Sequence, residues 1–202
     1  ARSTGRRRTT PRCDSTTNGD MTTRVIGGQT FNLTYDGENR LVGVSGAATA
    51  SFVYNGDGQR VKSTIGGVTT IFIGNYYEWH GSVSTSVSYY YAGTSRVAMK
   101  TGSGTTYFLL GDHLGSTSLV VDGSGTQQSG SPQGYLPWGE TRFGGVGTKY
   151  QYTGQYNETS LGLYYYGARW YDAGLGRFIT ADTIIPGPNN PQAWDRYAYS
   201  LN

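Results

Sequence analysis

Two neighbouring stretches of sequence decide the fold: Tyr35-Asp36-Gly37-Glu38-Asn39-Arg40-Leu41-Val42 and Tyr54-Asn55-Gly56-Asp57-Gly58-Gln59-Arg60-Val61. Each has a tyrosine followed by Asp or Asn, then a glycine, then an arginine followed by an aliphatic residue, and the two tyrosines lie 19 positions apart. Asp, Asn and Gly tolerate the backbone conformations of tight turns. The pattern therefore predicts a strand that ends in tyrosine, a turn, and a second strand that begins near arginine.

Strand-like segments continue on both sides of these units. A looser copy precedes them at residues 18–24, and apolar and polar residues alternate before each tyrosine, as in strands with one buried face. Glycine-containing turns separate further segments at residues 68–73, 86–91, 96–100, 106–110 and 118–121. Strands that recur at short intervals with turns between them predict an all-β meander.

The composition agrees with a β-protein and excludes other classes. Of 202 residues, 32 are glycine and 18 are tyrosine, and only 14 % are charged, against about 25 % in a typical domain. Abundant aromatic residues argue against disorder, no Gly-X-Y period indicates collagen, and no apolar run is long enough for a membrane helix. Common helix formers are scarce, so at most one short helix is predicted near the C-terminus, over Pro191 to Tyr199 with Asn190 as its cap.

The net charge of +3 arises from the first 12 residues, which hold five arginines and no acid. Removing those five from the 16 basic residues leaves 11 against 13 acidic ones, so the rest of the chain does not predict a nucleic-acid surface. These first 12 residues are interpreted as an irregular leader, and the alternative is a basic arm that contacts phosphate. Cys13 is the only cysteine, so it forms no disulfide within the chain and is interpreted as an unreactive thiol, with a disulfide between chains left open.

Changes in composition and sequence pattern divide the chain into four parts. Residues 1–13 are interpreted as an irregular basic leader, 14–122 as the hairpin repeats, 123–134 as a Gly- and Ser-rich loop, and 135–202 as a C-terminal segment rich in aromatic residues. The stretch 123–134 reads as one long hairpin loop more readily than as a linker. The pattern stops at Leu201-Asn202 without a closing turn, which indicates a truncation inside a longer pattern.

Several motifs in the second half carry a resemblance to a known family. They are Asp112-His113-Leu114-Gly115-Ser116-Thr117, Tyr135 with Trp138-Gly139-Glu140, Tyr152-Thr153-Gly154-Gln155-Tyr156, the stretch Gly162 to Asp172, and Leu175 to Asp182. With the upstream tyrosine–aspartate units, they resemble the YD-repeat (RHS-repeat) proteins, and in particular their RHS-repeat-associated core. The resemblance implies long hairpin ribbons that spiral into a hollow shell, often around a C-terminal toxin.

The resemblance also implies an autoproteolytic region built on two Asp-Pro-x-Gly segments, and here the chain departs from the family. Asp182 matches the first aspartate, but Thr183-Ile184-Ile185 follows it, and the second segment would lie beyond Asn202. An aspartyl protease needs two carboxylates that share a proton. Asp172 and Asp195 are the other candidates in this chain for such a partner.

The remaining candidate residues have a structural interpretation and a functional alternative. Asp112, His113 and Ser116 are interpreted as a capped turn, with a catalytic triad as the alternative. The tyrosines are interpreted as cross-strand ladders, with a glycan-binding face as the alternative. Arg169 and Arg177 are interpreted as stacked on neighbouring aromatic rings, with ligand binding as the alternative. The residues predicted to form the structural motif are Tyr35, Asp36, Arg40, Tyr54, Asn55, Arg60, Asp112, His113, Gly115, Trp138, Gly154, Tyr164, Tyr165, Arg169, Tyr171, Asp172, Gly176 and Arg177.

These observations predict an all-β ribbon or partial shell of tandem YD-type hairpins. No cluster of residues has metal-ligand spacing and no P-loop occurs, so neither a metal nor a cofactor is expected. The predicted function is a non-enzymatic structural module of an extracellular or cell-surface protein of the bacterial secreted type. Because charge-poor strand edges invite pairing, it is expected to associate with copies of itself or with further repeats, extending into a tube or filament. A self-cleaving core that releases a toxin and a glycan-binding module are the alternatives, and neither nucleic acid nor a membrane span is expected.

Overall fold

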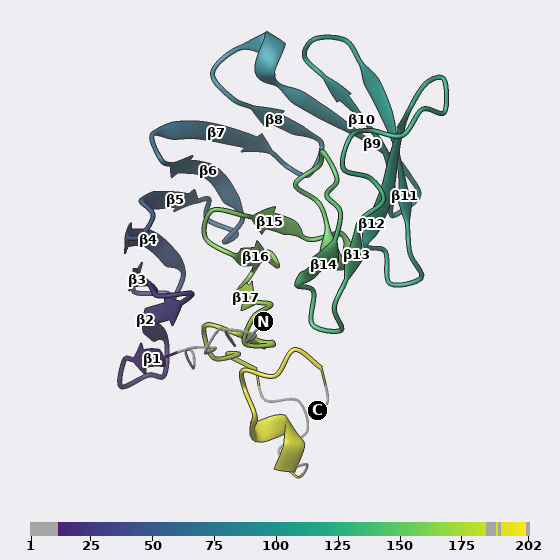
Figure 1. Cartoon of the computed structure of the whole chain (residues 1–202). Coiled ribbons are helices and arrows are strands. Elements are labelled where there is room, and N and C mark those ends of the chain that lie inside the picture. The colour runs from purple at the N-terminus through teal and green to yellow at the C-terminus, as the bar shows by residue number, and fades with distance from the viewer. Residues whose placement is uncertain (1–11, 185–188, 190, 201–202) are drawn as a thin grey trace, which may run out of the picture.

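The chain forms one long antiparallel meander followed by a segment that folds back inside it. The computed structural model describes residues 12–184, 189 and 191–200. Twelve strands pair in sequence order, and the sheet curls so that β2–β5 and β9–β12 lie on opposite sides of the later strands (Figure 1). The prediction of an all-β ribbon of tandem hairpins is therefore confirmed. The strands of this sheet are β1 Arg12–Ser15, β2 Met21–Ile26, β3 Gln29–Tyr35, β4 Leu41–Gly46, β5 Ala50–Tyr54, β6 Arg60–Ile65, β7 Val68–Ile73, β8 Tyr77–Trp79, β9 Val87–Ala92, β10 Ser95–Thr101, β11 Thr106–Gly111 and β12 Thr117–Asp122.

Each tyrosine–aspartate unit closes a hairpin with the same hydrogen bonds. In the β3–β4 turn, one carboxylate oxygen of Asp36 accepts the backbone N–H groups of the second and fourth residues after it, at 3.0 and 2.9 Å. The amide oxygen of Asn55 accepts the equivalent pair in the β5–β6 turn, at 3.1 and 2.8 Å. The fourth residue of each turn has a positive φ, 59° at Asn39 and 76° at Gly58, which Asn and Gly adopt most readily. The Asp or Asn and the positive-φ residue of the sequence pattern are thus the residues that form the turn.

A β-bulge beside each of these turns bends the sheet. The register shifts next to Tyr35 and next to Tyr54, and such bulges increase the local twist and bend of the strands. The tyrosine hydroxyls reach across to the neighbouring strand, where Tyr35 donates to the carbonyl of Met21 and Tyr54 to the carbonyl of Leu41, both at 2.7 Å. These hydrogen bonds allow large rings to be buried on the inner face. Repetition of the bulge and the hydroxyl contact curves the meander.

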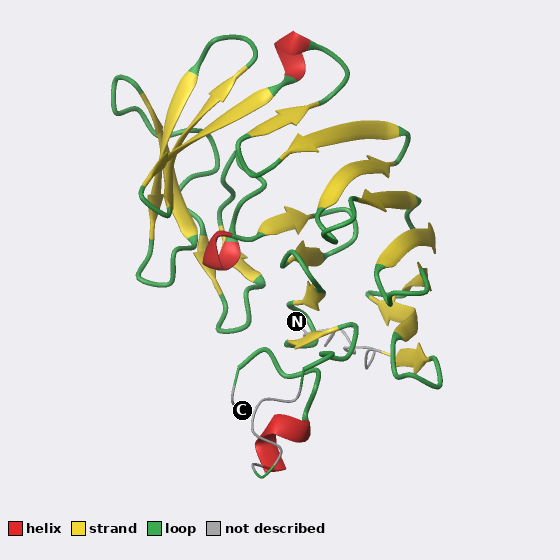
Figure 2. Cartoon of the chain, turned by 180° about the vertical axis from the view of Figure 1, so that it is seen from behind, coloured by secondary structure: helices red, strands yellow, loops and turns green. Residues whose placement is uncertain are grey.

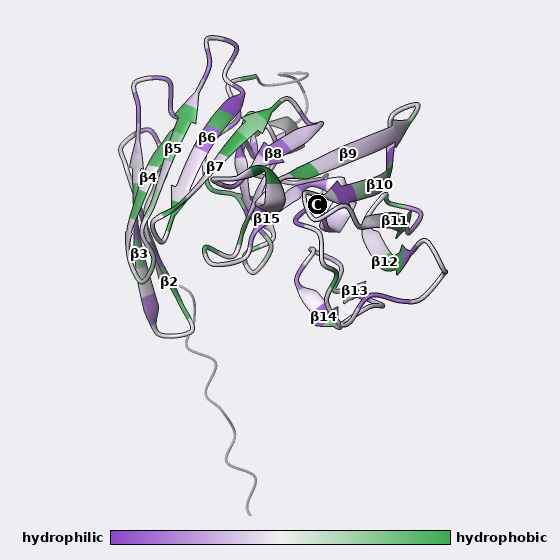
Figure 3. Ribbon diagram, turned by 90° about the horizontal axis from the view of Figure 1, so that it is seen from above, coloured by the Kyte–Doolittle hydropathy of each residue, from purple (hydrophilic) through white to green (hydrophobic). Residues whose placement is uncertain are grey.

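The concave face of the sheet is covered by residues 146–180, called here the inner segment. It contains β15 Tyr156–Glu158, β16 Leu163–Tyr165, β17 Trp170–Asp172 and β18 Arg177–Phe178, which form a four-stranded antiparallel sheet. A small hairpin, β13 Gly134–Tyr135 with β14 Thr141–Phe143, precedes it. Seen from above, β15 lies inside the curve of the large sheet (Figure 3).

Two main apolar cores lie between the large sheet and the inner segment. Because aliphatic residues are few, much of the buried surface comes from aromatic rings. The first core contains Met21, Phe31, Leu33, Leu41, Val44, Ala50 and Phe52 from the large sheet and Leu161, Leu163, Trp170 and Ile179 from the inner segment. The second contains Phe72, Tyr89, Met99, Leu109 and Val120 from the large sheet and Val146, Tyr150 and Tyr156 from the inner segment. Neither the sheet nor the inner segment buries its apolar face alone.

Helical structure in the described residues is limited to short 3₁₀ turns (Figure 2): Val83–Thr85, Tyr152–Gly154 and Pro191–Trp194. The helix expected over Pro191 to Tyr199 is shorter than predicted, because Ala198 leaves the helical path to form a β-bridge with Arg177. The predicted cap Asn190 lies outside the described residues. No helix in the described part of the chain is long and apolar enough to cross a membrane.

The ends of the large sheet differ in detail from the predicted boundaries. Arg12 and Cys13, assigned above to the irregular leader, already pair with β2, and residues 1–11 lie outside the described residues. At the other end, the stretch 123–134 turns back along β12, where the N–H of Gln128 donates to the carbonyl of Val120 at 2.8 Å. This stretch therefore extends the hydrogen bonding of the sheet edge.

Tyr54→Phe is expected to lower the free energy of unfolding by about 1–3 kcal/mol. The substitution leaves the carbonyl of Leu41 and the indole N–H of Trp170 without their hydrogen-bond partner in a buried place. Chemical denaturation followed by tryptophan fluorescence measures the change. Tyr90→Phe, at a ring that is 48 % exposed, is the matched control and should alter stability by less than about 0.5 kcal/mol. Equal effects of the two substitutions would contradict the role of the hydroxyl contact.

Candidate functional site

Three arginines from three strands tie the inner segment to the large sheet. They lie in β2, β6 and β10 and are spaced 36 positions apart in the sequence. The inner segment crosses the concave face from β10 toward β2, so that its successive contacts with these arginines are three or four residues apart. The contacts are Arg96 to the carbonyl of Gly154 (3.3 Å), Arg60 to the carboxylate of Glu158 (2.7 Å) and Arg24 to the carbonyl of Leu161 (2.6 Å).

Arg60 and Glu158 form a buried ion pair enclosed by aromatic rings. The side chains of Arg60 and Glu158 are only 2 % and 6 % exposed. The hydroxyl of Tyr165 accepts the backbone N–H of Arg60 at 3.0 Å, which adds a second link between β6 and the inner segment. The charge of the guanidinium is therefore balanced by one carboxylate and by the faces of the surrounding rings. The rings within 6 Å of the guanidinium carbon are Phe52 (5.9 Å), Phe72 (4.3 Å), Tyr156 (4.7 Å), Tyr165 (4.5 Å) and Trp170 (5.3 Å).

Burial affects the protonation of Glu158. Loss of hydration raises the pKa of the Glu158 carboxyl above its ordinary value, although the positive charge of Arg60 opposes the shift. Removing two charges from water costs several kcal/mol for each ion, and the attraction between them offsets this only when the geometry is good. The pair therefore fixes where the inner segment sits more than it adds net stability.

Arg24 holds the far end of the inner segment. Its Nε donates to the carboxylate of Asp172 at 2.5 Å, and its two terminal nitrogens donate to the carbonyls of Leu161 and Gly162. The other oxygen of Asp172 accepts the backbone N–H of Gly174 at 2.9 Å. Asp172 is fully buried, so Arg24 both neutralises it and satisfies two carbonyls at a bend of the inner segment.

Arg96 has the same strand position as Arg60 but a different environment. Arg60 pairs with Tyr54 across a bulge, and Arg96 pairs with Tyr91 across a bulge. The guanidinium of Arg96 lies 3.2 Å from the ring centroid of Tyr150 and donates to the hydroxyl of Tyr91 at 2.7 Å. Within the described part of the chain, no carboxylate lies at ion-pair distance from Arg96.

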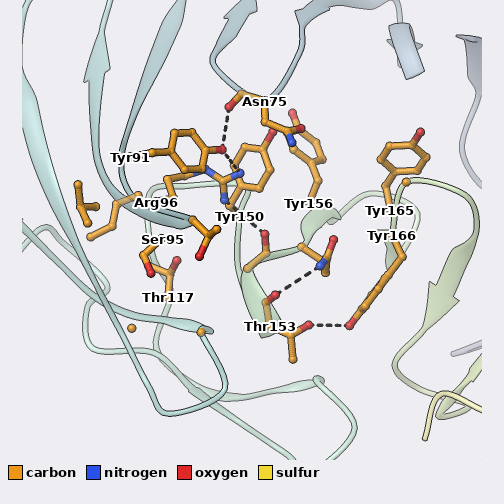
Figure 4. Close-up of a pocket in the computed structure, with 18 of the residues that line it drawn as sticks. Asn75, Tyr91, Ser95, Arg96, Thr117, Tyr150, Thr153, Tyr156, Tyr165 and Tyr166 are labelled. Atoms are coloured by element: carbon orange, nitrogen blue, oxygen red, sulfur yellow. Dashed lines mark hydrogen bonds between the residues drawn. The ribbon is translucent and has the colours of Figure 1, made fainter. Parts of the chain in front are cut away.

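A cavity of about 780 Å³ lies beside Arg96. Its mouth is formed by the turns β7–β8, β9–β10 and β11–β12, which share one edge of the sheet because alternate turns of a meander do so. Its floor is the inner segment, with Tyr156 and Tyr166 among its rings. Figure 4 shows Arg96 between Tyr91 and Tyr150 on one wall, and the hydrogen bond of 2.8 Å between Thr153 and Tyr166 across from it.

The three carboxylates considered for proteolysis have separate partners. Asp172 is paired with Arg24, as described above. Asp182 pairs with Arg169 at 2.8 Å, and Asp195 accepts the backbone N–H of Tyr197 within its own turn at 3.1 Å. The described contacts therefore bring no two of these carboxylates together to share a proton.

The segment Asp112 to Ser116 is a further copy of the YD turn. One carboxylate oxygen of Asp112 accepts the N–H groups of Leu114 and Ser116, both at 2.9 Å, and Gly115 supplies the positive φ of 79°. His113 is exposed in this turn, while Ser116 is buried and its hydroxyl accepts the N–H of Thr153 at 3.1 Å. Asp112 is hydrogen-bonded within the turn and Ser116 to the inner segment, so Asp112, His113 and Ser116 do not form a catalytic triad.

The remaining motif residues join the C-terminal hairpins to one another. The Trp138 carbonyl accepts the hydroxyl of Tyr171 at 2.8 Å, and the indole of Trp138 packs over Gly176. Tyr164 donates to the carbonyl of Gly139 at 3.1 Å.

The other three motif arginines stack on rings. Arg169 lies 3.8 Å from the ring centroid of Phe178, and Arg177 lies 5.0 Å from that of Tyr197. Arg40 also lies over a ring, that of Tyr54 at 5.3 Å, and it pairs with Asp36 of its own turn, much as Arg169 pairs with Asp182.

Sequence reasoning missed Arg24, Arg96 and Glu158. The equal spacing of 36 residues between Arg24, Arg60 and Arg96 can be read from the sequence. It is not a repeat of one strand position, because Arg60 and Arg96 each face a tyrosine across a bulge whereas Arg24 pairs with Cys13 and Phe31. Nothing local marks Glu158, whose role depends on where the inner segment returns to the sheet. In the described part of the chain, no group of three or more His, Cys, Asp or Glu side chains is arranged to hold a metal ion.

Comparisons with known proteins find sequence similarity to two bacterial nucleases and a mosquito surface protein. No family model matches the chain. The tRNA3(Ser)-specific nuclease WapA of Bacillus spizizenii and the tRNA nuclease WapA of Bacillus subtilis are each 26 % identical to it over 187 residues, or 85 % of this chain. The salivary gland surface protein 1 of Aedes aegypti is 37 % identical over 83 residues, or 39 % of this chain. This chain spans only 8 % of the length of the two nucleases and 2 % of the mosquito protein.

Solved structures share the fold over almost the whole chain. The crystal structure of TcdB2-TccC3-Cdc42 matches 91 % of this chain with a TM-score of 0.71 and 21 % identity. A Photorhabdus luminescens Tc holotoxin pore matches 93 % with a TM-score of 0.72 and 20 % identity. In both cases, the match covers 10 % of the other chain. The fold is accordingly that of RHS-repeat shell proteins.

The predicted function, a self-associating structural module, is wrong. Relatives that match 85 % of the chain are named as tRNA nucleases, which is a toxin-type function, and the alternatives of a self-cleaving core and a glycan-binding module are set aside with it. The prediction rested on open strand edges, and the edge at β12 is instead paired within the chain, where the N–H groups of Gln128 and Gln133 donate to the carbonyls of Val120 and Ser118, both at 2.8 Å.

Arg60→Met is expected to lower the free energy of unfolding by about 3–5 kcal/mol at neutral pH, because it leaves the Glu158 carboxylate buried without a partner. Adding Glu158→Gln to this variant should restore part of the loss. Lys62→Met, on the exposed side of the same strand, is the control and should have little effect. Urea denaturation measures all four proteins. If the double variant is no more stable than Arg60→Met, the unpaired carboxylate is not the cause.

Glu158 should also give stability a pH dependence. Its pKa is raised in the folded protein above the ordinary 4.5, so the folded state binds this proton more tightly than the unfolded chain does. The stability that this site contributes is therefore greatest below pH 4.5 and declines as the pH rises toward the folded pKa. Denaturation curves across this range should show a smaller decline in Glu158→Gln than in the unaltered chain. Parallel pH profiles would contradict the assignment.

Proposed function

We propose that this chain forms part of the wall of a β-shell in a toxin-type protein whose toxic action is directed at RNA. The observation that carries the proposal is the match to two proteins named as tRNA nucleases along 85 % of the chain. The curved sheet supports the role as a wall, because its concave face is covered by residues 146–180 of the same chain and the sheet therefore needs no other protein to bury that face. The RNA-directed action is assigned to the whole protein, since this chain spans 8 % of those relatives.

The contacts between the large sheet and the inner segment support the proposal that this chain is a wall, with the RNA-directed action belonging to the whole protein. The inner segment closes the concave face with two apolar cores and with arginines drawn from strands four apart. Each arginine contacts a different stretch of the inner segment, so the curvature of the sheet and the position of the inner segment are fixed together. An extracellular place of action, as for a protein released to reach other cells, is part of the same proposal.

Competition between producer and sensitive cells tests the proposal. Producers of the whole protein that contains this chain should inhibit sensitive neighbours, and northern blots should show cleaved tRNA in the inhibited cells. Arg60→Met producers should lose most of the inhibition because the wall is loosened, whereas Lys62→Met producers should keep it. Inhibition without tRNA cleavage would overturn the RNA-directed action. Full inhibition by Arg60→Met at an equal protein level would overturn the need for this wall.

A further inference from the structure

Arg96 and its cavity form a site that the wall itself does not use. We propose that the cavity binds an organic carboxylate, with Arg96 as the residue that receives the acid group. The inference is independent of the proposed function, since it rests on the comparison of two equivalent positions in the sheet.

The first step is the equivalence of Arg60 and Arg96. Each faces a tyrosine across a bulge and is the first or second residue of an even-numbered strand. Each tyrosine hydroxyl donates to a backbone carbonyl, Tyr54 to that of Leu41 in β4 at 2.7 Å and Tyr91 to that of Asn75 in the β7–β8 turn at 3.0 Å. Both guanidinium groups lie against rings of the inner segment. The backbone therefore presents two arginines in the same way.

The second step is the difference in charge balance between the two positions. Arg60 meets the Glu158 carboxylate at 2.7 Å, and Arg24 likewise meets the carboxylate of Asp172. Arg96 meets only neutral acceptors in the described residues, namely the Gly154 carbonyl and a tyrosine hydroxyl. The place that a carboxylate fills at the other two arginines is thus unfilled by this chain at the third.

The third step excludes Glu78, a buried glutamate near the cavity, as the partner of Arg96. Glu78 is 2 % exposed, and its Oε2 accepts the hydroxyl of Tyr156 at 3.3 Å and lies 3.3 Å from Nε2 of His80. Glu78 is not among the residues that line the cavity. Glu78 is therefore held by Tyr156 and His80 behind the cavity wall. The carboxylate that does line the cavity, Asp112, accepts the N–H groups of Leu114 and Ser116 in its own turn. Neither acid forms an ion pair with Arg96.

The fourth step is the size and chemistry of the cavity. A volume of about 780 Å³ lies within the range of about 300–1,000 Å³ that is usual for small-molecule pockets. Tyrosine rings supply flat apolar surface, and the hydroxyls of Ser95, Thr117 and Thr153 supply polar contacts (Figure 4). The Nε of Arg96 is buried and has no hydrogen-bond partner. A carboxylate carried on a flat or peptide-like body matches these features, because arginine binds carboxylates with charge-assisted hydrogen bonds.

Two sources share this chemistry: a free aromatic acid and an acidic side chain of a peptide. The probes are therefore 4-hydroxyphenylacetate and a capped tetrapeptide with one glutamate, with the glutamine tetrapeptide as its neutral match. Isothermal titration calorimetry on the full chain should detect binding of at least one carboxylate probe. Preference for the free acid assigns the cavity to small acids, and preference for the glutamate peptide assigns it to an acidic segment of a polypeptide.

Variants decide whether Arg96 receives the acid. Arg96→Met should weaken the binding of the carboxylate probe at least tenfold, whereas Arg40→Met, which removes an arginine outside the cavity, should leave it unchanged. Ser95→Trp fills the cavity from an exposed position at its mouth and keeps Arg96. It should abolish binding, and it decides the matter if Arg96→Met does not fold. The proposal is overturned if neither carboxylate probe binds at millimolar concentration, if the glutamine peptide binds as well as the glutamate peptide, or if both cavity variants bind normally.

Discussion

The buried pairing of Arg60 with Glu158 is the interaction on which the arrangement of the molecule depends. It joins β6, in the middle of the large sheet, to β15, the first strand of the inner segment. A charge in an apolar core is tolerated only with a partner in a defined place. Any displacement of the inner segment along the sheet would separate the charges, so the pair sets the register between two layers that otherwise meet through rings and methyl groups.

The curvature of the sheet makes this pairing possible. A flat meander of twelve strands would place β2 and β10 too far apart for a single short segment to contact both. Bulges at the YD turns bend the strands, and the tyrosine hydroxyls tie each hairpin to its neighbour. The inner segment then needs only residues 154–162 to pass from the arginine of β10 to that of β2. The bulges and hydrogen bonds at the YD turns thus determine how far apart β2 and β10 lie across the concave face.

Equivalent positions in a repeat protein need not have equivalent roles. Arg60 and Arg96 face a tyrosine across a bulge in the same way and both line the cavity, yet only Arg60 is neutralised by a carboxylate of the described chain. The difference arises from the inner segment, which is not itself a regular repeat and presents Glu158 to the first arginine and Gly154 to the second. Repetition of the outer sheet creates several possible sites, and the irregular inner segment determines which of them remain open.

The sequence by itself determined the all-β class, the hairpin units and the chemistry of each turn, because these depend on residues close together in the chain. Asp36 and Asn39 are sufficient to specify their turn, and the same pattern identifies the turn at Asp112. Only the tertiary structure decided that Arg24, Arg60 and Arg96 all face the inner segment, and that Glu158 balances just one of them. These contacts join residues far apart in sequence, between 58 and 137 positions for the hydrogen bonds of Arg96 to Gly154 and of Arg24 to Leu161. The path of the inner segment across the concave face follows from how strongly the sheet curves, a property of the whole meander that no single repeat contains.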